Sequence, residues 1–412
     1  MSSLKFLTRD VKIPLRRLFA VMLLFSNTLA AFYIFHYYLL DLMFKQIGAD
    51  SFYFFVARML FLSLAVSSGI IGSLIVERVD QRKFLWSWLF FGLLVTVSLV
   101  FFVGLEFALF SCAMLGVSMG LGFPTCQAFL TESTTVEERG RVAGIAIFVA
   151  FAAVVLSFVL ADSFNMGLSS LIWAIILLKA TSFLALKIDP CRREKGPTLP
   201  WLSVVVSKGF LSFALPWLIF HLANGILVFG SLSSEFANVE ALGSTVELFG
   251  TILTVVVAGF AADFFGRKQP LLVGLIMLGI SYIFFGLVAT PESYFIYLIV
   301  EGVAWGLIAV TYMQVILGDL SAASGSKEKF FVLGGIMIPL LTFQIFSLVQ
   351  DWSKLTVPAS TLSRFLSIAI LLSVVPVFRA SETLPESKMR ERKLKQHVEK
   401  VRKLVEESRK GE

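Results

Sequence analysis

Residues 143–162 read AGIAIFVAFAAVVLSFVLAD, and the only charged side chain in this stretch is Asp162, at its last position. A helix of about 20 residues rises about 1.5 Å per residue and spans about 30 Å, the thickness of the hydrocarbon core of a bilayer. Backbone amides in lipid need partners within their own segment, so a run of this kind has to be helical. The stretch therefore predicts a transmembrane helix.

Runs of similar length recur along the whole chain. Hydrophobic residues make up 57% of the 412 residues, charged residues only 15%, and the mean hydropathy is +0.86, values outside the usual range for a soluble protein. The runs also lack the alternation of a membrane barrel. We predict an all-α membrane protein with twelve transmembrane helices, at residues 17–40, 51–76, 84–103, 106–130, 143–162, 165–187, 206–230, 243–262, 270–290, 293–317, 330–350 and 360–380.

The net charge of +7 indicates topology rather than nucleic-acid binding. Lys and Arg lie in the two tails and in alternate short loops, whereas the opposite loops carry mostly acidic residues. Cytoplasmic loops are enriched in Lys and Arg. The pattern predicts a multi-pass protein of the cell (plasma or inner) membrane, with both termini in the cytoplasm.

An internal repeat divides the chain. Glu77 and Asp263 differ by 186 positions, and the same offset relates two pairs of glycines, Gly116 with Gly302 and Gly120 with Gly306. Parallel repeats are a common design among transporters. We predict an N-terminal six-helix bundle (1–187), a cytoplasmic linker (188–205), a C-terminal six-helix bundle (206–381) and a basic amphipathic cytoplasmic tail (382–412).

The loop after the eighth predicted helix carries a recognisable motif. Residues 259–268 read GFAADFFGRK and resemble motif A of the major facilitator superfamily, GxxxDRxGRK, with only the Arg after the Asp missing. The first-half copy keeps Glu77 and Arg78 but has Ser73 and Asp80 where the family has Gly. The loop at 137–144, EERGRVAG, is also similar to a loop found in many members of this family.

This resemblance implies the major facilitator fold, with twelve helices in two pseudo-symmetric six-helix bundles, and a gate formed by these loops. In such a gate, carboxylates accept hydrogen bonds from helix N-termini, and Arg or Lys side chains hold the cytoplasmic helix ends together. The expected gating residues are Glu77, Arg78, Arg82, Arg139, Arg141, Gly259, Asp263, Gly266, Arg267 and Lys268.

The resemblance also implies that the first, fourth, seventh and tenth helices line a central cavity. Charged side chains in lipid are costly, so each is a functional candidate. Glu301 is the sharpest, because it lies about 12 Å below the outer surface. It is expected to exchange protons or to form a structural hydrogen bond. The other candidates for substrate or proton binding are His36, His221, Asn27, Asn224, Gln127 and Gln314, and Arg58 and Lys179 are expected to extend towards a membrane surface.

These features predict a secondary transporter that moves a small molecule by alternating access, with coupling to protons. Efflux of amphipathic or toxic compounds and uptake of a metabolite by symport or uniport both fit the sequence. The alternatives from another class are a membrane sensor with this fold and an integral membrane enzyme. No P-loop, DxxxD or HExxH motif occurs, so we expect no enzyme activity, catalytic residue, metal or cofactor. The expected partners are a small-molecule substrate, protons and the lipid bilayer, and the protein is expected to be a monomer.

Overall fold

The computed structural model describes residues 12–101, 104–163, 167–189, 196–227, 237–348 and 357–385, together with Val398 and Val401. Over this part of the chain the structure is helical and contains no strand, and twelve helical segments are long and apolar enough to cross a membrane. The all-α prediction with twelve spans is therefore confirmed. Most of the predicted tail lies outside these residues.

The first six spans occupy residues 15–188. The first is a continuous helical run of α2 (Leu15–Val21), η1 (Met22–Ser26), α3 (Asn27–Ile34), η2 (Phe35–Leu39) and α4 (Leu40–Gln46). The next five are α5 (Ser51–Val76), α6 (Gln81–Ser98) with η3 (Leu99–Phe101), α7 (Leu105–Ser133), α8 (Arg139–Ser163) and α9 (Gly167–Ile188).

The last six spans follow the short helix α10 (Trp201–Val205) on the connecting segment. They are α11 (Lys208–Leu227), α13 (Ala237–Phe265), α14 (Lys268–Leu287), then α15 (Pro291–Ala309) with η5 (Val310–Ile316) and α16 (Leu317–Ser321), then α17 (Lys327–Phe331) with η6 (Val332–Met337) and α18 (Ile338–Leu348), and finally α19 (Ala359–Arg379). The segments η1, η2, η5 and η6 are π-helical turns, which often occur at functional positions.

The predicted end of the first helix, at residue 40, was wrong. Asp41 and Lys45 are charged, which favoured a loop, but they form an i,i+4 ion pair of 2.6 Å on α4. Such pairs support a helix surface. The helix therefore continues to Gln46.

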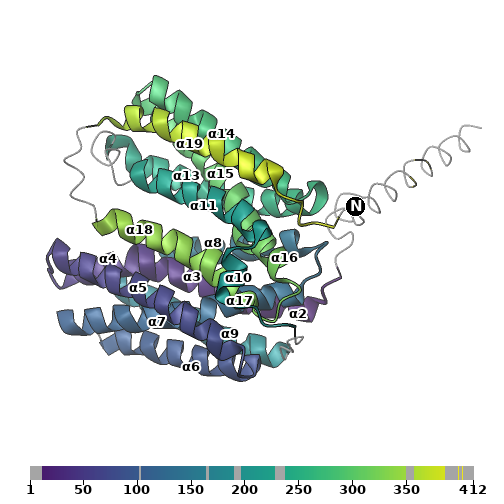
Figure 1. Cartoon of the computed structure of the whole chain (residues 1–412). Coiled ribbons are helices and arrows are strands. Elements are labelled where there is room, and N and C mark those ends of the chain that lie inside the picture. The colour runs from purple at the N-terminus through teal and green to yellow at the C-terminus, as the bar shows by residue number, and fades with distance from the viewer. Residues whose placement is uncertain are drawn as a thin grey trace, which may run out of the picture.

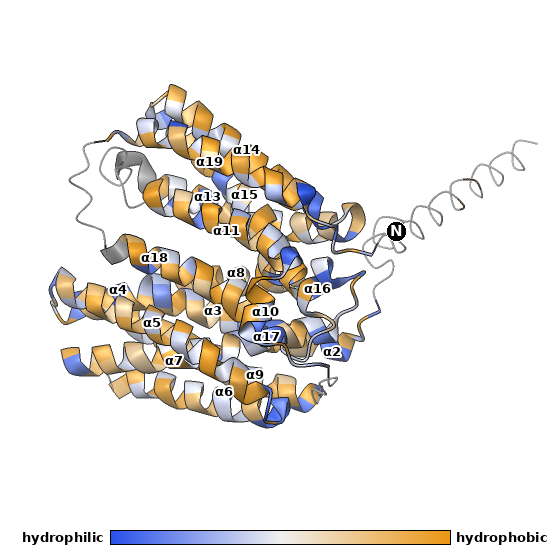
Figure 2. Ribbon diagram, viewed as in Figure 1, coloured by the Kyte–Doolittle hydropathy of each residue, from blue (hydrophilic) through white to orange (hydrophobic). Residues whose placement is uncertain are grey.

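Both ends of the described chain lie on one side of the helix bundle. We call this side the linker face, because residues 196–207 between the two sets of six spans run along it; α2, α10, α16 and α17 meet there (Figure 1). The opposite side is the far face. Hydrophilic residues gather at the helix ends on the linker face, and hydrophobic residues cover the spans (Figure 2). This distribution fits a lipid-embedded bundle.

The sequence repeat has a structural counterpart in two helix pairs. A Cβ atom built on Gly116 of α7 would lie 2.4 Å from the backbone oxygen of Phe61 on α5, and one built on Gly302 of α15 would lie 2.3 Å from that of Glu247 on α13. Phe61 and Glu247 are themselves 186 positions apart. Only glycine permits such close helix contact, so the same small-residue contact is used in both halves.

Candidate functional site

The carboxylate of Asp263 is the centre of an ion cluster on the linker face. It lies near the end of α13 and is fully buried. One oxygen accepts hydrogen bonds from the Gly140 backbone N–H at 2.9 Å and from Arg267 Nη1 at 3.0 Å. The other accepts from the backbone N–H of Arg141 at 2.9 Å and from its Nε at 3.1 Å. We call Asp263, Arg141 and Arg267 the second-half latch.

Glycine explains how Asp263 reaches the start of α8. A Cβ atom on Gly259 would lie 2.2 Å from the Gly140 backbone oxygen, and one on Gly140 would lie 2.4 Å from that of Gly259. The two helices therefore touch backbone to backbone. The first amides of α8 have no partner within their own helix, so a carboxylate placed there satisfies them.

Arg267 extends the cluster to the end of α16. Its Nε donates to Asp319 at 2.9 Å, and its Nη2 donates to the backbone oxygen of Val136. Burial alone would lower the pKa of Arg267, but the carboxylates of Asp319 and Asp263 more than offset burial, so its pKa lies above the ordinary value. Arg139 forms a second buried ion pair with Asp319. The cluster thus joins α8 of the first half to α13 and α16 of the second.

The described end of the chain closes over this cluster. Glu382 accepts hydrogen bonds from the backbone N–H groups of Arg267 at 2.9 Å and of Lys268 at 3.2 Å, and Thr383 donates to Asp319 at 3.0 Å. The Lys268 ammonium donates to the backbone oxygens of Phe378 and Ala380. Gly266, with a φ of +99°, makes the turn that brings these amides to Glu382.

The corresponding contact of the first half is built differently. Glu77 forms an ion pair of 2.8 Å with Lys329 at the start of the eleventh span. The Lys329 ammonium also donates to the backbone oxygen of Leu199 on the connecting segment. We call Glu77 and Lys329 the first-half latch. Arg78 and Arg82, which the sequence placed in the same gate, are exposed, and no ion pair of either is found among the described residues.

A pair of glutamine side chains also joins the two halves. Gln314 Nε2 donates to the backbone oxygen of Gln127 at 3.0 Å, and Gln127 Nε2 donates to that of Met313 at 3.3 Å. Both side chains are buried. The amides therefore connect α7 to η5 directly, and the two sequence-predicted candidates are brought together.

Glu301 lies in the middle of the second half, nearly fully buried at 3% exposure. Its hydrogen-bonding neighbours are the side chains of Tyr297 and Trp305 on the same helix. Glu247 on α13 interacts electrostatically with Glu301, and also with Tyr33 and Tyr37 in the first half. The arrangement places two carboxyl groups next to the boundary between the halves.

The two predicted histidines occupy separate aromatic clusters. His36 stacks on Phe32 and Phe61 at ring distances of 5.5 Å, and His221 packs edge-on against Trp217 at 4.2 Å and against Trp305 at 5.6 Å. No ring contact joins the two histidines within the described part of the chain.

The two asparagines differ in their contacts. Asn27 Nδ2 donates to Leu178 and Thr181 on α9 at 3.0 Å, so it joins two helices. Asn224 is half-buried, and its Oδ1 finds no hydrogen-bond donor among the described side chains and backbone groups.

The Arg58 side chain reaches one turn back along α5 and across to α18. Its guanidinium lies over the rings of Phe54 at 4.8 Å and Phe343 at 5.1 Å, a cation–π arrangement that joins α5 to α18. Gln344 supports the same contact, because its Nε2 donates to Ser63 Oγ at 2.8 Å. The first-half candidates therefore reach the second half through α18.

Three functional candidates of the structure were not predicted. Asp319, Glu247 and Lys329 sit at or near helix ends or within an apolar run, where no motif distinguished them. The sequence repeat offers a signal for Lys329. It lies 188 positions after Arg141, close to the repeat offset of 186, and it pairs with Glu77, the counterpart of Asp263. Asp319 has no such signal.

The fold consists of two related halves that are joined by the paired latches on the linker face. A family model described as "Sugar (and other) transporter" matches residues 229–409, which is less than half of the chain. The crystal structure of the human organic anion transporter MFSD10 (TETRAN) matches with a TM-score of 0.64 and 14% sequence identity, over 88% of this chain and 99% of that chain. None of the curated proteins matches this chain significantly. The family model and the shared fold together support a transporter of the major facilitator superfamily.

Proposed function

We propose that this protein moves a small molecule across the membrane by alternating access and couples the movement to protons at Glu301. The observation that carries the proposal is a nearly fully buried carboxylate at midspan with a second carboxyl, Glu247, beside it. Two carboxylates in a low-dielectric site repel each other, so binding of a proton stabilises the pair and its release requires access to water. Alternate exposure of such a site provides coupling.

The latches supply the second part of the proposal. Both join the halves on the linker face, and the glutamine pair joins the halves as well. This combination fits a state closed on the linker face. Opening would require the ion pairs to separate, and the two halves would rock about Glu301 and Glu247.

We also propose that the linker face is cytoplasmic in the cell membrane and that the transporter is a monomer. The basic residues of the loops favour this orientation. Efflux of amphipathic compounds is the preferred direction, because aromatic rings pack against both histidines: Phe343 against His36, and Trp217 and Trp305 against His221. Uptake of a metabolite by symport is the alternative.

Proteoliposomes with an imposed pH gradient test the coupling. The probes are ethidium, as an amphipathic compound, and a radiolabelled hexose. Glu301→Gln is expected to abolish accumulation driven by the gradient, whereas substrate exchange measured in the absence of a gradient should continue. Glu292→Gln is the matched control, because Glu292 is an exposed carboxylate at the start of the same helix. Gradient-driven accumulation in Glu301→Gln equal to that of the unmodified protein would remove Glu301 from the coupling role.

The sign of the gradient distinguishes the two directions of transport. Accumulation in vesicles that are acidic inside indicates exchange of substrate for protons, as efflux requires. Accumulation in vesicles that are acidic outside indicates symport.

A further inference from the structure

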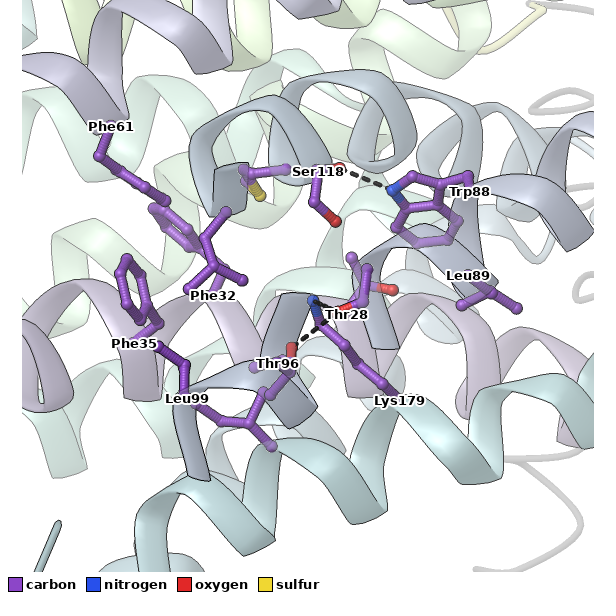
Figure 3. Close-up of a pocket in the computed structure, with 15 residues that line it drawn as sticks. Thr28, Phe32, Phe35, Phe61, Trp88, Leu89, Thr96, Leu99, Ser118 and Lys179 are labelled. Atoms are coloured by element: carbon purple, nitrogen blue, oxygen red, sulfur yellow. Dashed lines mark hydrogen bonds between the residues drawn. The ribbon is translucent and has the colours of Figure 1, made fainter. Parts of the chain in front are cut away.

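A cavity of about 40 Å³ lies within the first half, away from the carboxyl pair. It is only partly enclosed, and residues of α3, η2, α5, α6, η3, α7 and α9 line it; Figure 3 shows these side chains. Its walls are largely apolar, and they include Phe32, Phe35, Phe61, Leu99 and Met119. Ligand sites typically combine an apolar lining with a few well-placed polar groups. The polar groups of this cavity therefore determine which ligand it can bind.

Lys179 brings a charge into this apolar space. It lies 12 residues from the start of α9 and 9 residues from its end, or about 18 Å and about 14 Å along the helix, too deep for its ammonium to reach water at either face. Instead, its Nζ donates to the backbone oxygen of Gly92 at 3.0 Å. Among the described residues no carboxylate forms an ion pair with it. A midspan cation without a counter-ion is a functional candidate.

Ser118 places a second donor at the same point. A Cβ atom on Gly92 would lie 2.7 Å from Ser118 Oγ and 3.1 Å from Lys179 Nζ, so the glycine leaves a small space in which both groups converge. No hydrogen bond from the Ser118 hydroxyl is found within the described structure. By contrast, Thr96 donates to Gly92 and Thr28 donates to Leu24. Lys179 and Ser118 are thus the donors available to a ligand.

The chemistry of these groups selects the ligand. An ammonium with spare N–H groups and a hydroxyl can donate to the two oxygens of a carboxylate. One positive charge balances one negative charge, whereas a doubly charged phosphate would keep an unpaired charge in a dry site. The aromatic and aliphatic walls suit a short alkyl chain.

We propose that this cavity binds a short-chain monocarboxylate, with its carboxylate at Lys179 and Ser118 and its alkyl chain between α3 and η3. The site lies inside one half and does not depend on the carboxyl pair at Glu301. A free carboxylate and the carboxyl end of a membrane fatty acid offer the same chemistry.

Binding to the full-length protein in lipid nanodiscs tests the proposal without any measurement of flux. Hexanoate is expected to raise the unfolding temperature in a saturable way, and hexanol, its uncharged counterpart, is not. Lys179→Met is expected to weaken hexanoate binding by about tenfold to a hundredfold, because a charge-assisted hydrogen bond is lost. Lys187→Met is the matched control, since Lys187 is exposed on the same helix.

A second variant covers the case in which Lys179→Met does not fold. Gly92→Ala keeps both donors in the sequence but puts a methyl group where they converge, and both neighbouring atoms are ends of side chains that can move aside. We expect it to fold and to lose hexanoate binding. Equal stabilisation by hexanoate and hexanol, or full hexanoate binding in either variant, would overturn the proposal.

The source of the ligand is decided by comparing hexanoate with oleate. Stabilisation by oleate in the nanodisc but not by hexanoate would overturn the short-chain ligand and assign the site to the carboxyl end of a membrane fatty acid. Stabilisation by hexanoate points to a free carboxylate. Failure of both acids overturns the site but leaves the proton-coupling proposal unaffected.

Discussion

The two latches on the linker face occupy pseudo-equivalent places and differ in how they hold their carboxylates. Asp263 is fully buried and accepts hydrogen bonds from two backbone amides and from the side chains of Arg141 and Arg267. Glu77 stays 13% exposed and forms its ion pair with one flexible Lys329. A carboxylate held by backbone amides has less freedom than one held by a single long side chain. The repeat therefore preserves the place of the contact but not its strength.

Helix packing explains the difference. Gly140 and Gly259 let α8 and α13 touch, so the amides at the start of α8 reach Asp263. At the first-half latch, the close backbone contact is replaced by the long side chain of Lys329, which spans the gap to Glu77. We infer that separation of α8 from α13 is the more costly step in opening the linker face.

Among the variants that test this comparison, Asp263→Asn is expected to have the largest effect on stability and on opening of the linker face. The change removes the buried carboxylate that pairs with Arg141 and Arg267, although Arg267 keeps its ion pair with Asp319. Breaking a typical buried pair costs about 3–5 kcal/mol. We expect lower thermal stability and an open linker face. Labelling of a cysteine introduced at the buried Ser321, in a protein whose native cysteines are replaced by serine, measures the opening.

A far-face reporter controls for unfolding. Tyr37 is already half exposed. If only the linker face opens, labelling of a cysteine at this position (Tyr37→Cys) should not increase when Asp263→Asn is added. Unchanged labelling at Ser321→Cys would contradict the assignment of Asp263 as the main latch.

Gly259→Ala should give the next largest effect, because the added methyl group meets the backbone of α8 at 2.2 Å. Overpacking of this kind costs about 1–3 kcal/mol. Gly69→Ala is the matched control, because its nearest neighbours would be 3.5 Å away, at ordinary contact distance. Thermal unfolding of both variants measures the difference, and an equal loss of stability would show that the close α8–α13 contact is not special.

Glu77→Gln is expected to cost less, about 1 kcal/mol, because it breaks one ion pair where Asp263→Asn breaks two, and Lys329 keeps its hydrogen bond to the backbone oxygen of Leu199. Ser321→Cys labelling compares the two variants. If Glu77→Gln opens the linker face as far as Asp263→Asn does, the ranking of the latches is wrong.

Arg78→Ala and Arg82→Ala should have the smallest effects, within about 0.5 kcal/mol in thermal unfolding, because both side chains are exposed. The family resemblance placed them in the gate. A marked loss of stability in either variant would restore them to it.

Apolar runs predicted all twelve spans, because a helix in lipid needs a continuous hydrophobic surface and little else. Charges within helices were harder to interpret. Asp41 and Lys45 extend the first span instead of ending it, and Lys179 does not extend towards a membrane surface. In each case the position of the charge depends on one partner group, and the sequence spacing does not show which group that is.

The candidate sites were predicted unevenly. Asp263 and Arg267 were found because a motif marks them, and the structure brings them to Arg141 as the resemblance implied. Asp319 and Glu247 were missed, because their partners come from helices far away in the sequence. His36 and His221 lie 185 positions apart, close to the repeat offset, but no ring contact joins them in the described part of the chain.

The sequence by itself determined that this protein is a helical membrane protein with duplicated halves and a basic linker face, because hydrophobic length, charge bias and repeat spacing are properties of the chain. Only the tertiary structure decided which charges are partners. An ion pair or a cavity depends on side chains that approach within a few ångströms from separate helices, and that approach is set by glycine contacts and helix packing.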